Sequence, residues 1–400
     1  MATAPTTRFE SILVISTRQL GDVLLTTPLI HAARERWPEA RIDVLGFKGT
    51  LGLLAGNPDV GRLIEVPPGS GWKQSWPLIK SLWRRYDLAL IAQYSDRAHL
   101  YGLIAARQRS GLVLKKRSLS WWKRLMLVHA VTVDVDQTHA VIEKVKLIEP
   151  WADVKEVSVR PPAGSSLPAD VFEELRPPYV VLQIPSLVAY KQWPLQHAAE
   201  LARALIADDL QVVLSGSGST LDREKVGEVM AMLNASAPKA IASISNDSRD
   251  ADPTPQPAVL DVAGRLDLQQ VTTLLQGAAL YIGPDTSITH LAAACGTPMI
   301  ALFGPISPTL WGPWPQGAMP VQPYVPNRLR QPLGTMTLLQ GTPPCVPCNR
   351  AGCDNHNESR SECLETMLPE RVLAEARALL AETASGEETR TAPRSEWSFP

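Results

Sequence analysis

The chain has 400 residues, of which 45% are hydrophobic and 20% charged, and its formal net charge is -1. These values support two domains with sizeable cores in a soluble protein and argue against a nucleic-acid-binding chain. No stretch approaches the roughly 18–20 uninterrupted apolar residues of a membrane span, and residues 1–10 lack the apolar core of a signal peptide, so we expect a cytoplasmic protein. Five cysteines without an export signal argue against a disulfide framework.

The first element is a strand-like run at Ile12–Ile15, followed by a polar loop with Arg18 and by an apolar helix that opens at Gly21-Asp22 and is interrupted at Pro28. Asp22 therefore lies at the carboxyl edge of a first parallel strand, where open α/β sheets bind their ligands. Taken alone, a Gly-Asp pair at a helix start is more often a cap than a catalytic group.

Strand-like and helical runs alternate through both halves, which predicts an α/β protein with parallel sheets. The further expected strands are Ile42–Gly46, Leu63–Val66, Leu88–Ala92, Tyr179–Ile184, Gln211–Ser215, Val259–Ala263, Ala279–Ile282 and Met299–Phe303, with helices at Pro28–Arg36 and Leu78–Arg84. Residues 160–170, rich in Pro, Gly and Ser, are the best linker candidate. The sequence therefore predicts domains over 1–165 and 166–382, a loop at 243–257 and a disordered tail over 383–400.

The segment 278–305 predicts a strand, a tight turn, a small-residue helix and a second strand. Asp285, Thr286 and Ser287 fall at the start of the helix, where unpaired N–H groups and the helix dipole favour an anion, above all a diphosphate. Asp285 or Thr286 could equally serve only as a helix cap. The segment has the outline of a nucleotide-sugar site.

Five motifs follow one another over both halves of the chain: GDVLLTTPLI at 21–30, NPDV at 57–60, KQWP at 191–194, GPDTSITHLAAACGTP at 283–298 and ALFGPISPTLWGPW at 301–314. Together they resemble glycosyltransferase family 9, the ADP-heptose:lipopolysaccharide heptosyltransferases, from about residue 11 to about 382. The loop 17–20 and the C-terminal cysteines look more like the heptosyltransferase III branch. The resemblance implies the GT-B fold, in which two Rossmann-like domains face each other across a cleft.

The resemblance also implies an inverting transfer of heptose from ADP-heptose to the lipid A–Kdo inner core of lipopolysaccharide, on the cytoplasmic face of the inner membrane, with no cofactor needed for catalysis. Asp22 corresponds to the general base and Lys191 to an ADP contact. The turn that holds the diphosphate corresponds to Asp285, Thr286, Ser287, Ile288 and His290. Ser287 departs from the glycine common at its place, although it still offers an N–H and a hydroxyl. The acidic contact on the adenosine side is either Asp222 or Glu224.

Each of these residues has a simpler interpretation. Lys191 could be a solvated surface lysine, and His290, inside an apolar helix, could be a hydrogen-bonded core residue. The chain could also use another nucleotide sugar, or be an inactive GT-B module that binds a nucleotide or a glycan. The presence of Asp22, Lys191 and the Asp285 turn together argues against an inactive module.

Between Arg97 and Val133 the sequence has no acidic residue, and basic residues surround Trp121-Trp122. A patch of one charge sign with interfacial aromatic residues suits an anionic, membrane-embedded acceptor, although a solvated basic face is an equal alternative. The basic residues of the segment are Arg107, Arg109, Lys115, Lys116, Arg117, Lys123 and Arg124. Arg18, Lys115, Lys116 and Arg117 are the candidate contacts to acceptor or lipid.

Four cysteines, Cys345, Cys348, Cys353 and Cys363, form a C-x2-C-x4-C-x9-C series in a Pro- and Gly-rich loop at 340–365, with His356 nearby. Four thiols at such spacings could hold a structural zinc, could remain reduced and free, or, less favourably, could bind an iron–sulfur cluster. Cys295 lies in the apolar helix and is expected to be a small core residue.

Overall fold

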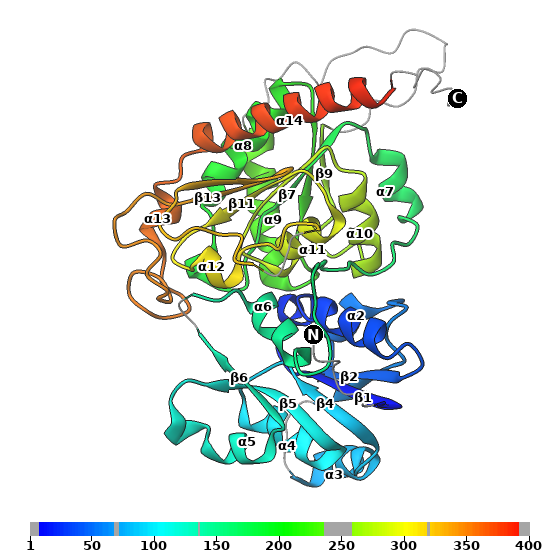
Figure 1. Ribbon diagram of the computed structural model, residues 1–400. Coiled ribbons are helices and arrows are strands. Elements are labelled where there is room, and N and C mark those ends of the chain that lie inside the picture. The colour runs from blue at the N-terminus through cyan, green and yellow to red at the C-terminus, as the bar shows by residue number, and fades with distance from the viewer. Residues whose placement is uncertain (1–7, 68–71, 135–136, 236–257, 318–320, 392–400) are drawn as a thin grey trace, which may run out of the picture.

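The computed structural model describes the chain except for residues 1–7, 68–71, 135–136, 236–257, 318–320 and 392–400. The described residues form two α/β halves that face each other (Figure 1). The fold is therefore GT-B with two Rossmann-like domains, as predicted. The loop expected at 243–257 lies outside the described residues.

The first half contains a six-stranded parallel sheet in the order β3-β2-β1-β4-β5-β6. Its strands are β1 Ser11–Ser16, β2 Arg41–Phe47, β3 Arg62–Val66, β4 Tyr86–Ile91, β5 Ala106–Leu114 and β6 His129–Val133. Its helices are α1 Leu20–Leu24, α2 Thr27–Arg36, α3 Trp72–Leu82, α4 Asp96–Ala105, α5 Trp121–Met126 and α6 Ala140–Val145, with short 3-10 turns at Leu51–Leu54, Arg117–Leu119 and Lys146–Ile148. The central strand β1 is apolar on both faces: Ile12 and Val14 belong to one core cluster, Leu13 and Ile15 to another. Such continuous apolar runs are typical of strands covered by helices on both sides.

The second half contains a seven-stranded sheet in the order β12-β13-β11-β10-β7-β8-β9, in which only the β12–β13 pair is antiparallel among the described strands. Its strands are β7 Tyr179–Gln183, β8 Gln211–Ser215, β9 Val259–Asp261, β10 Leu280–Pro284, β11 Met299–Phe303, β12 Arg330–Leu333 and β13 Met336–Gln340. Its helices are α7 Ala169–Glu174, α8 Leu195–Ala207, α9 Thr220–Ala235, α10 Leu268–Gln276, α11 Ser287–Cys295, α12 Pro308–Trp311, α13 Glu362–Glu365 and α14 Pro369–Thr391, with a 3-10 turn at Ala189–Lys191. None of the described helices is long and apolar enough to cross a bilayer.

Every expected strand is present and lies within two residues of its predicted ends, whereas β5, β6, β12 and β13 were not expected. The helix expected at Leu78–Arg84 overlaps α3, which begins earlier, at Trp72, and ends at Leu82. At the C-terminus, α14 continues to Thr391, so a helix occupies the beginning of the segment predicted to be disordered from residue 383.

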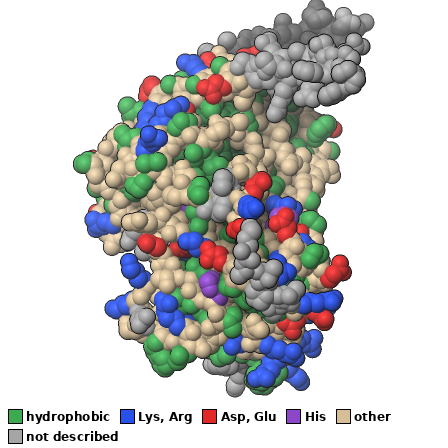
Figure 2. Space-filling view, in the orientation of Figure 1, with side chains coloured by type: hydrophobic (Ala, Val, Ile, Leu, Met, Phe, Trp, Pro, Cys, Tyr) green, Lys and Arg blue, Asp and Glu red, His purple; other side chains and the backbone are tan. Residues whose placement is uncertain are grey.

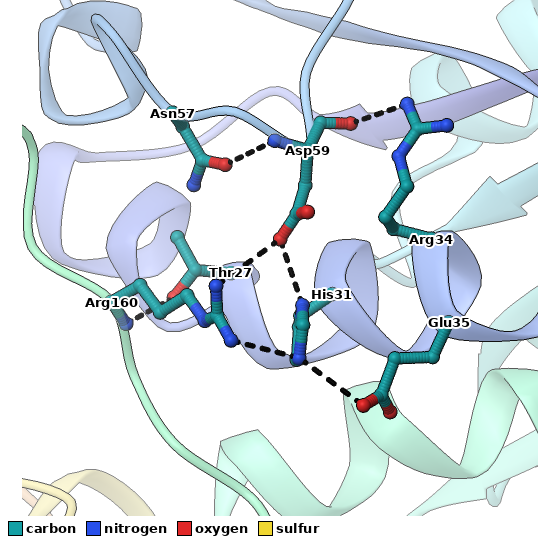
Figure 3. Close-up of polar contacts among 7 residues, drawn as sticks. All are labelled: Thr27, His31, Arg34, Glu35, Asn57, Asp59 and Arg160. Atoms are coloured by element: carbon teal, nitrogen blue, oxygen red, sulfur yellow. Dashed lines mark hydrogen bonds and ion pairs between the residues drawn. The ribbon is translucent and has the colours of Figure 1, made fainter. Parts of the chain in front are cut away.

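The segment that leads out of the first half is tied to it by a polar network (Figure 3). Arg160 donates its backbone N–H to Thr27 Oγ1 at 2.9 Å, and its guanidinium Nη2 lies 2.8 Å from His31 Nε2. His31 Nδ1 in turn lies 2.9 Å from Asp59 Oδ2. Because Nε2 must accept from the guanidinium, Nδ1 carries the proton and donates to the carboxylate. Asn57 Oδ1 accepts the Asp59 N–H, so the NPDV motif has a structural role here.

Candidate active site

A cleft of about 760 Å³ lies between the two halves. Its first wall is the loop and helix after β1, and its second wall is formed by the ends of β7, β8 and β10 with the segments that follow them. In Figure 1, α11 and α12 of the second half face α2 and α6 of the first. The two walls come close at Gly21, where an added Cβ would lie 3.3 Å from His290 Cδ2, so glycine lets α1 approach α11. The cleft therefore lies at the carboxyl ends of both sheets, where such folds bind ligands.

Asp22 stands in α1 on the first wall, and its side chain is 15% exposed. Arg18 Nη1 lies 3.7 Å from Asp22 Oδ1. The Arg18 guanidinium is itself held over the ring of Tyr94, 5.3 Å from its centroid, and donates to the Tyr94 hydroxyl at 3.3 Å. Among the described residues, Arg18 is thus the ion-pair partner of Asp22, which also lines the cleft.

Lys191 and Asp285 form an ion pair of 2.6 Å on the second wall. Burial lowers the pKa of Lys191, but the adjacent Asp285 carboxylate outweighs this effect and raises the pKa above its ordinary value. Lys191 therefore carries a positive charge at neutral pH. It is not the solvated surface lysine of the simpler interpretation, because it lines the cleft and is held by a buried carboxylate.

Helix α11 begins on the same wall, and its cap is Thr286. The Thr286 hydroxyl accepts the Thr289 N–H at 3.4 Å, whereas Asp285 pairs with Lys191. The next two residues, Ser287 and Ile288, line the cleft. The first N–H groups of a helix have no partner within the helix, so this end offers hydrogen-bond donors and positive partial charge to an anion.

His290, one turn into α11, is buried, and burial lowers its pKa to about 4 despite the nearby Asp285 carboxylate. It is therefore neutral at physiological pH. Its Nε2 lies 4.0 Å from Asp285 Oδ1, while its Nδ1 has no hydrogen-bond partner among the described residues. His290 is thus buried, as expected for a core histidine, but its Nδ1 lacks the hydrogen bond that such a residue would make.

The far end of the cleft is bordered by the loop Ser215–Ser219 after β8. Asp222 also lines the cleft and accepts the Ser217 N–H at 3.1 Å. Glu224, the alternative acidic residue, is not among the lining residues. The geometry therefore favours Asp222 over Glu224.

A smaller chamber of about 350 Å³ adjoins the cleft and shares Arg18, Asp22 and Trp311 with it. Two charged residues of α6 line this chamber, and burial lowers the pKa of Lys144 to about 8 and raises the pKa of Glu143 to about 7. No motif pointed to this pair. The one available signal was the presence of two charged residues in the otherwise apolar helix AVIEKV.

The two tryptophans of the WGPW loop have different roles. Trp311 lines both chambers. Trp314 is buried and donates its indole N–H to the Val157 carbonyl at 2.8 Å, so it is a packing residue that joins the second half to the segment leading out of the first.

The structure divides the basic segment between several roles. Lys123 is buried and pairs with Asp96 at 2.6 Å, and Arg109 donates to the carbonyls of Met126 and Ala106. These two basic side chains are therefore engaged within the fold. Lys115 and Lys116 are exposed, and the side chain of Arg117 lies outside the described residues.

For the four loop cysteines the sequence left a zinc site, free thiols or an iron–sulfur cluster as alternatives. Cys345 and Cys353 are exposed, Cys348 is half-buried and Cys363 is buried, and all four thiols are free. Burial, with the other three thiols nearby, raises the pKa of Cys363 to about 12. Within the described part of the chain, no three His, Cys, Asp or Glu side chains are grouped so that they could hold a metal ion.

Two Rossmann-like domains with a cleft between the carboxyl ends of their sheets form the GT-B fold. The chain belongs to glycosyltransferase family 9 (heptosyltransferase), whose family model matches residues 75–326. It is 26% identical to lipopolysaccharide heptosyltransferase 3 of Escherichia coli K12 over 318 residues, covering 74% of this chain and 83% of that protein.

Two solved structures share the fold. One is the ADP-heptose lipopolysaccharide heptosyltransferase II of E. coli, with a TM-score of 0.66, 22% identity and coverage of 94% of this chain and 99% of that one. The other is the E. coli heptosyltransferase WaaC with ADP, with a TM-score of 0.61, 18% identity and coverage of 92% and 99%.

Proposed function

We propose that this glycosyltransferase moves heptose from ADP-heptose to a sugar of the lipopolysaccharide inner core, with inversion at the anomeric carbon. The observation that carries the proposal is the placement of Asp22 on one wall of the cleft opposite the Lys191–Asp285 pair and the start of α11. An acidic group thus faces a cationic, N–H-rich wall. That is the arrangement needed when an acceptor hydroxyl attacks a sugar whose leaving group is a diphosphate.

In this reaction the acceptor oxygen forms a bond to the anomeric carbon while the bond from that carbon to the β-phosphate oxygen breaks. Asp22 takes the proton of the attacking hydroxyl, and ADP leaves with the electron pair of the broken bond. Lys191 and the first N–H groups of α11, at Ser287 and Ile288, stabilise the negative charge that grows on ADP. Asp222 is in place for the ribose or adenine end of the nucleotide.

The cleft and the side chamber can each hold one of the two substrates. The volume of about 760 Å³ is within the range of nucleotide-sized pockets. The side chamber opens beside Asp22 and is lined by Gln93, Tyr94 and Ser95, whose polar groups can bind sugar hydroxyls. We assign the cleft to ADP-heptose and the chamber to the acceptor sugar.

The end of the first domain that lies away from the second suits contact with the cytoplasmic face of an anionic membrane. Helix α4 packs against both α3 and α5 there (Figure 1), and Figure 2 shows apolar and basic side chains on this end of the molecule. Large exposed apolar side chains lie on these helices and in the segments that adjoin them, and Lys115 and Lys116 are exposed. The apolar set is Trp76, Trp83, Leu100, Leu103, Leu119, Trp121, Leu125 and Val128. Exposed tryptophans beside lysines are typical of surfaces that insert into an interface with anionic lipid.

The test is a panel of nucleotides and nucleotide sugars added to the purified protein, followed by measurement of the melting temperature. ADP and ADP-heptose should raise it, because a ligand that binds only the folded state stabilises that state. Stabilisation by UDP- or GDP-sugars with no response to ADP would contradict the proposed donor and favour a transferase with another nucleotide sugar.

A further inference from the structure

The short helix α6 connects the contact between the two domains with the backbone of Asp22. His139 caps the N-terminal end of α6 and reaches the second domain, and Lys144, in the last turn, reaches Asp22. Both side chains are buried. Neither residue belongs to a motif that pointed to the site.

His139 makes a specific bond at the first of these two ends. Its Nδ1 accepts the Val141 N–H at 3.2 Å, so the proton is on Nε2, which donates to the Gly312 carbonyl of the second domain at 2.8 Å. Burial lowers the pKa of His139 to about 3, so the ring stays neutral and keeps this tautomer. The ring also packs against Trp314, with the ring centroids 4.9 Å apart. The carbonyl of Gly312 directly follows Trp311, which lines both chambers.

Lys144 acts on the Asp22 main chain at the other end. Its Nζ donates to the Asp22 carbonyl at 2.9 Å, and Thr26 Oγ1 donates to the same oxygen at 2.8 Å. Two donors on one carbonyl fix the orientation of the peptide group that follows Asp22. Burying an ammonium group costs free energy, and among the described residues the Asp22 carbonyl is its one hydrogen-bond acceptor. A methionine of similar length would avoid this cost, so we expect the ammonium group to have a role that explains a lysine at this position.

We propose that α6 is a strut and that His139 and Lys144 are positioning residues, which set the Asp22 carboxylate according to the placement of the second domain. This inference rests on the proposed role of Asp22 as general base. A base must lie within hydrogen-bond reach of the attacking hydroxyl, and a displacement of about 1 Å can lower the rate roughly a hundredfold. The strut thus links the position of the donor-binding domain to the geometry of the base on the other wall.

The experiment compares the variants Lys144→Met and His139→Asn, their double variant and the control Lys146→Met. Methionine keeps the length of Lys144 without its donor or charge, and asparagine keeps the helix cap of His139 but is too short for the Gly312 carbonyl. Lys146 directly follows α6, is half-buried and lies outside both chambers. Melting temperatures establish that each variant is folded.

The first readout is amide hydrogen exchange, which does not depend on activity. Residues 20–26 should exchange roughly tenfold faster in Lys144→Met and also faster in His139→Asn, because the bonds that hold this segment are lost. The control should match the wild type. Unchanged exchange over 20–26 in both variants would overturn the strut, whatever the reaction turns out to be.

The second readout is steady-state transfer of heptose. Lys144→Met should lower kcat by about ten- to a hundredfold while the acceptor KM and the ADP affinity remain within about threefold of the wild type. The double variant should lose less than the product of the two single losses, since both act on one strut. A raised acceptor KM with unchanged kcat would make Lys144 an acceptor contact instead. If the loss of kcat in the double variant equals the product of the two single losses, His139 and Lys144 act independently and are not linked through α6. A wild type that transfers no heptose but shows the expected exchange pattern would contradict the proposed reaction and leave the strut supported.

Discussion

Removal of the Lys191 charge should weaken ADP binding for two separate reasons. A charge-assisted contact to the diphosphate is lost, at a cost of about 1.5–3 kcal/mol. In addition, Asp285, which is only 7% exposed, is left as a buried carboxylate without its partner and repels the diphosphate. Since about 1.4 kcal/mol is a factor of ten, Lys191→Ala should raise the ADP dissociation constant at least about tenfold, and about a hundredfold at the upper end.

Titration calorimetry with ADP measures this change, and a second variant separates its two causes. In Lys191→Ala/Asp285→Asn the orphaned carboxylate is gone, so the double variant should bind ADP more tightly than Lys191→Ala alone. The exposed Lys155, which lies outside the cleft, provides the matched control as Lys155→Met. An unchanged dissociation constant in Lys191→Ala would refute the donor role of Lys191. A double variant no better than the single one would refute the repulsion assigned to Asp285.

Three further predictions concern the exposed lysines of the first domain, a buried histidine and the cysteine loop. The double variant Lys115→Glu/Lys116→Glu should no longer sediment with anionic vesicles, and high salt should have the same effect on the wild type. The double variant should still glycosylate a soluble truncated acceptor. Equal vesicle binding by the variant and the wild type would leave these lysines as solvated groups. The pKa of His139 falls from its ordinary value to about 3 in the folded state because of burial, with Lys144 and His290 adding to the effect, so its contribution to stability is present above pH 6.5 and is lost on acidification. Between pH 6.5 and pH 4, the free energy of unfolding should therefore fall by up to about 3 kcal/mol less in His139→Asn than in the wild type. Denaturant unfolding measures this change, and parallel pH curves for the two proteins would contradict it. Cys348→Ser should leave the melting temperature and metal content unchanged; one zinc per chain in the wild type, lost in this variant, would show that the thiols do bind metal.

Nine strands of the two sheets were predictable because each is a local apolar run. Runs such as Ile12–Ile15 and Met299–Phe303 are apolar on both faces, which is a signal that a few neighbouring residues carry. Strand β5 was missed because it begins with Ala-Arg-Gln-Arg, whose polar groups bond to nearby carbonyls, as Arg109 does. Residues 158–168 have no regular secondary structure, but this does not define where one domain ends and the next begins. The two ends of the linker therefore remain a prediction.

The site was predictable where a motif existed and not where contacts join distant residues. The motifs singled out Asp22, Lys191 and the start of α11, which line one cleft in the structure, and their roles remain predictions. The pairing of Lys191 with Asp285 could not be read from two residues far apart in the chain. Lys144 was missed for the same reason, because its partner is a main-chain carbonyl in another helix. The cysteine spacing left a metal site and free thiols as alternatives, because spacing alone says nothing about which thiols are buried or how they are grouped.

We propose that Asp22 is the base of a heptosyl transfer from ADP-heptose. The direct measurement is the conversion of a heptose-deficient lipopolysaccharide acceptor by the purified protein with ADP-heptose, followed by ADP release and by mass spectrometry of the product, for the wild type and Asp22→Asn. The wild type should add one heptose for each ADP released, and Asp22→Asn should be slower by roughly two to four orders of magnitude with ADP affinity near that of the wild type. Turnover by Asp22→Asn at the wild-type rate, or a wild type that leaves ADP-heptose intact while consuming another nucleotide sugar, would contradict the claim.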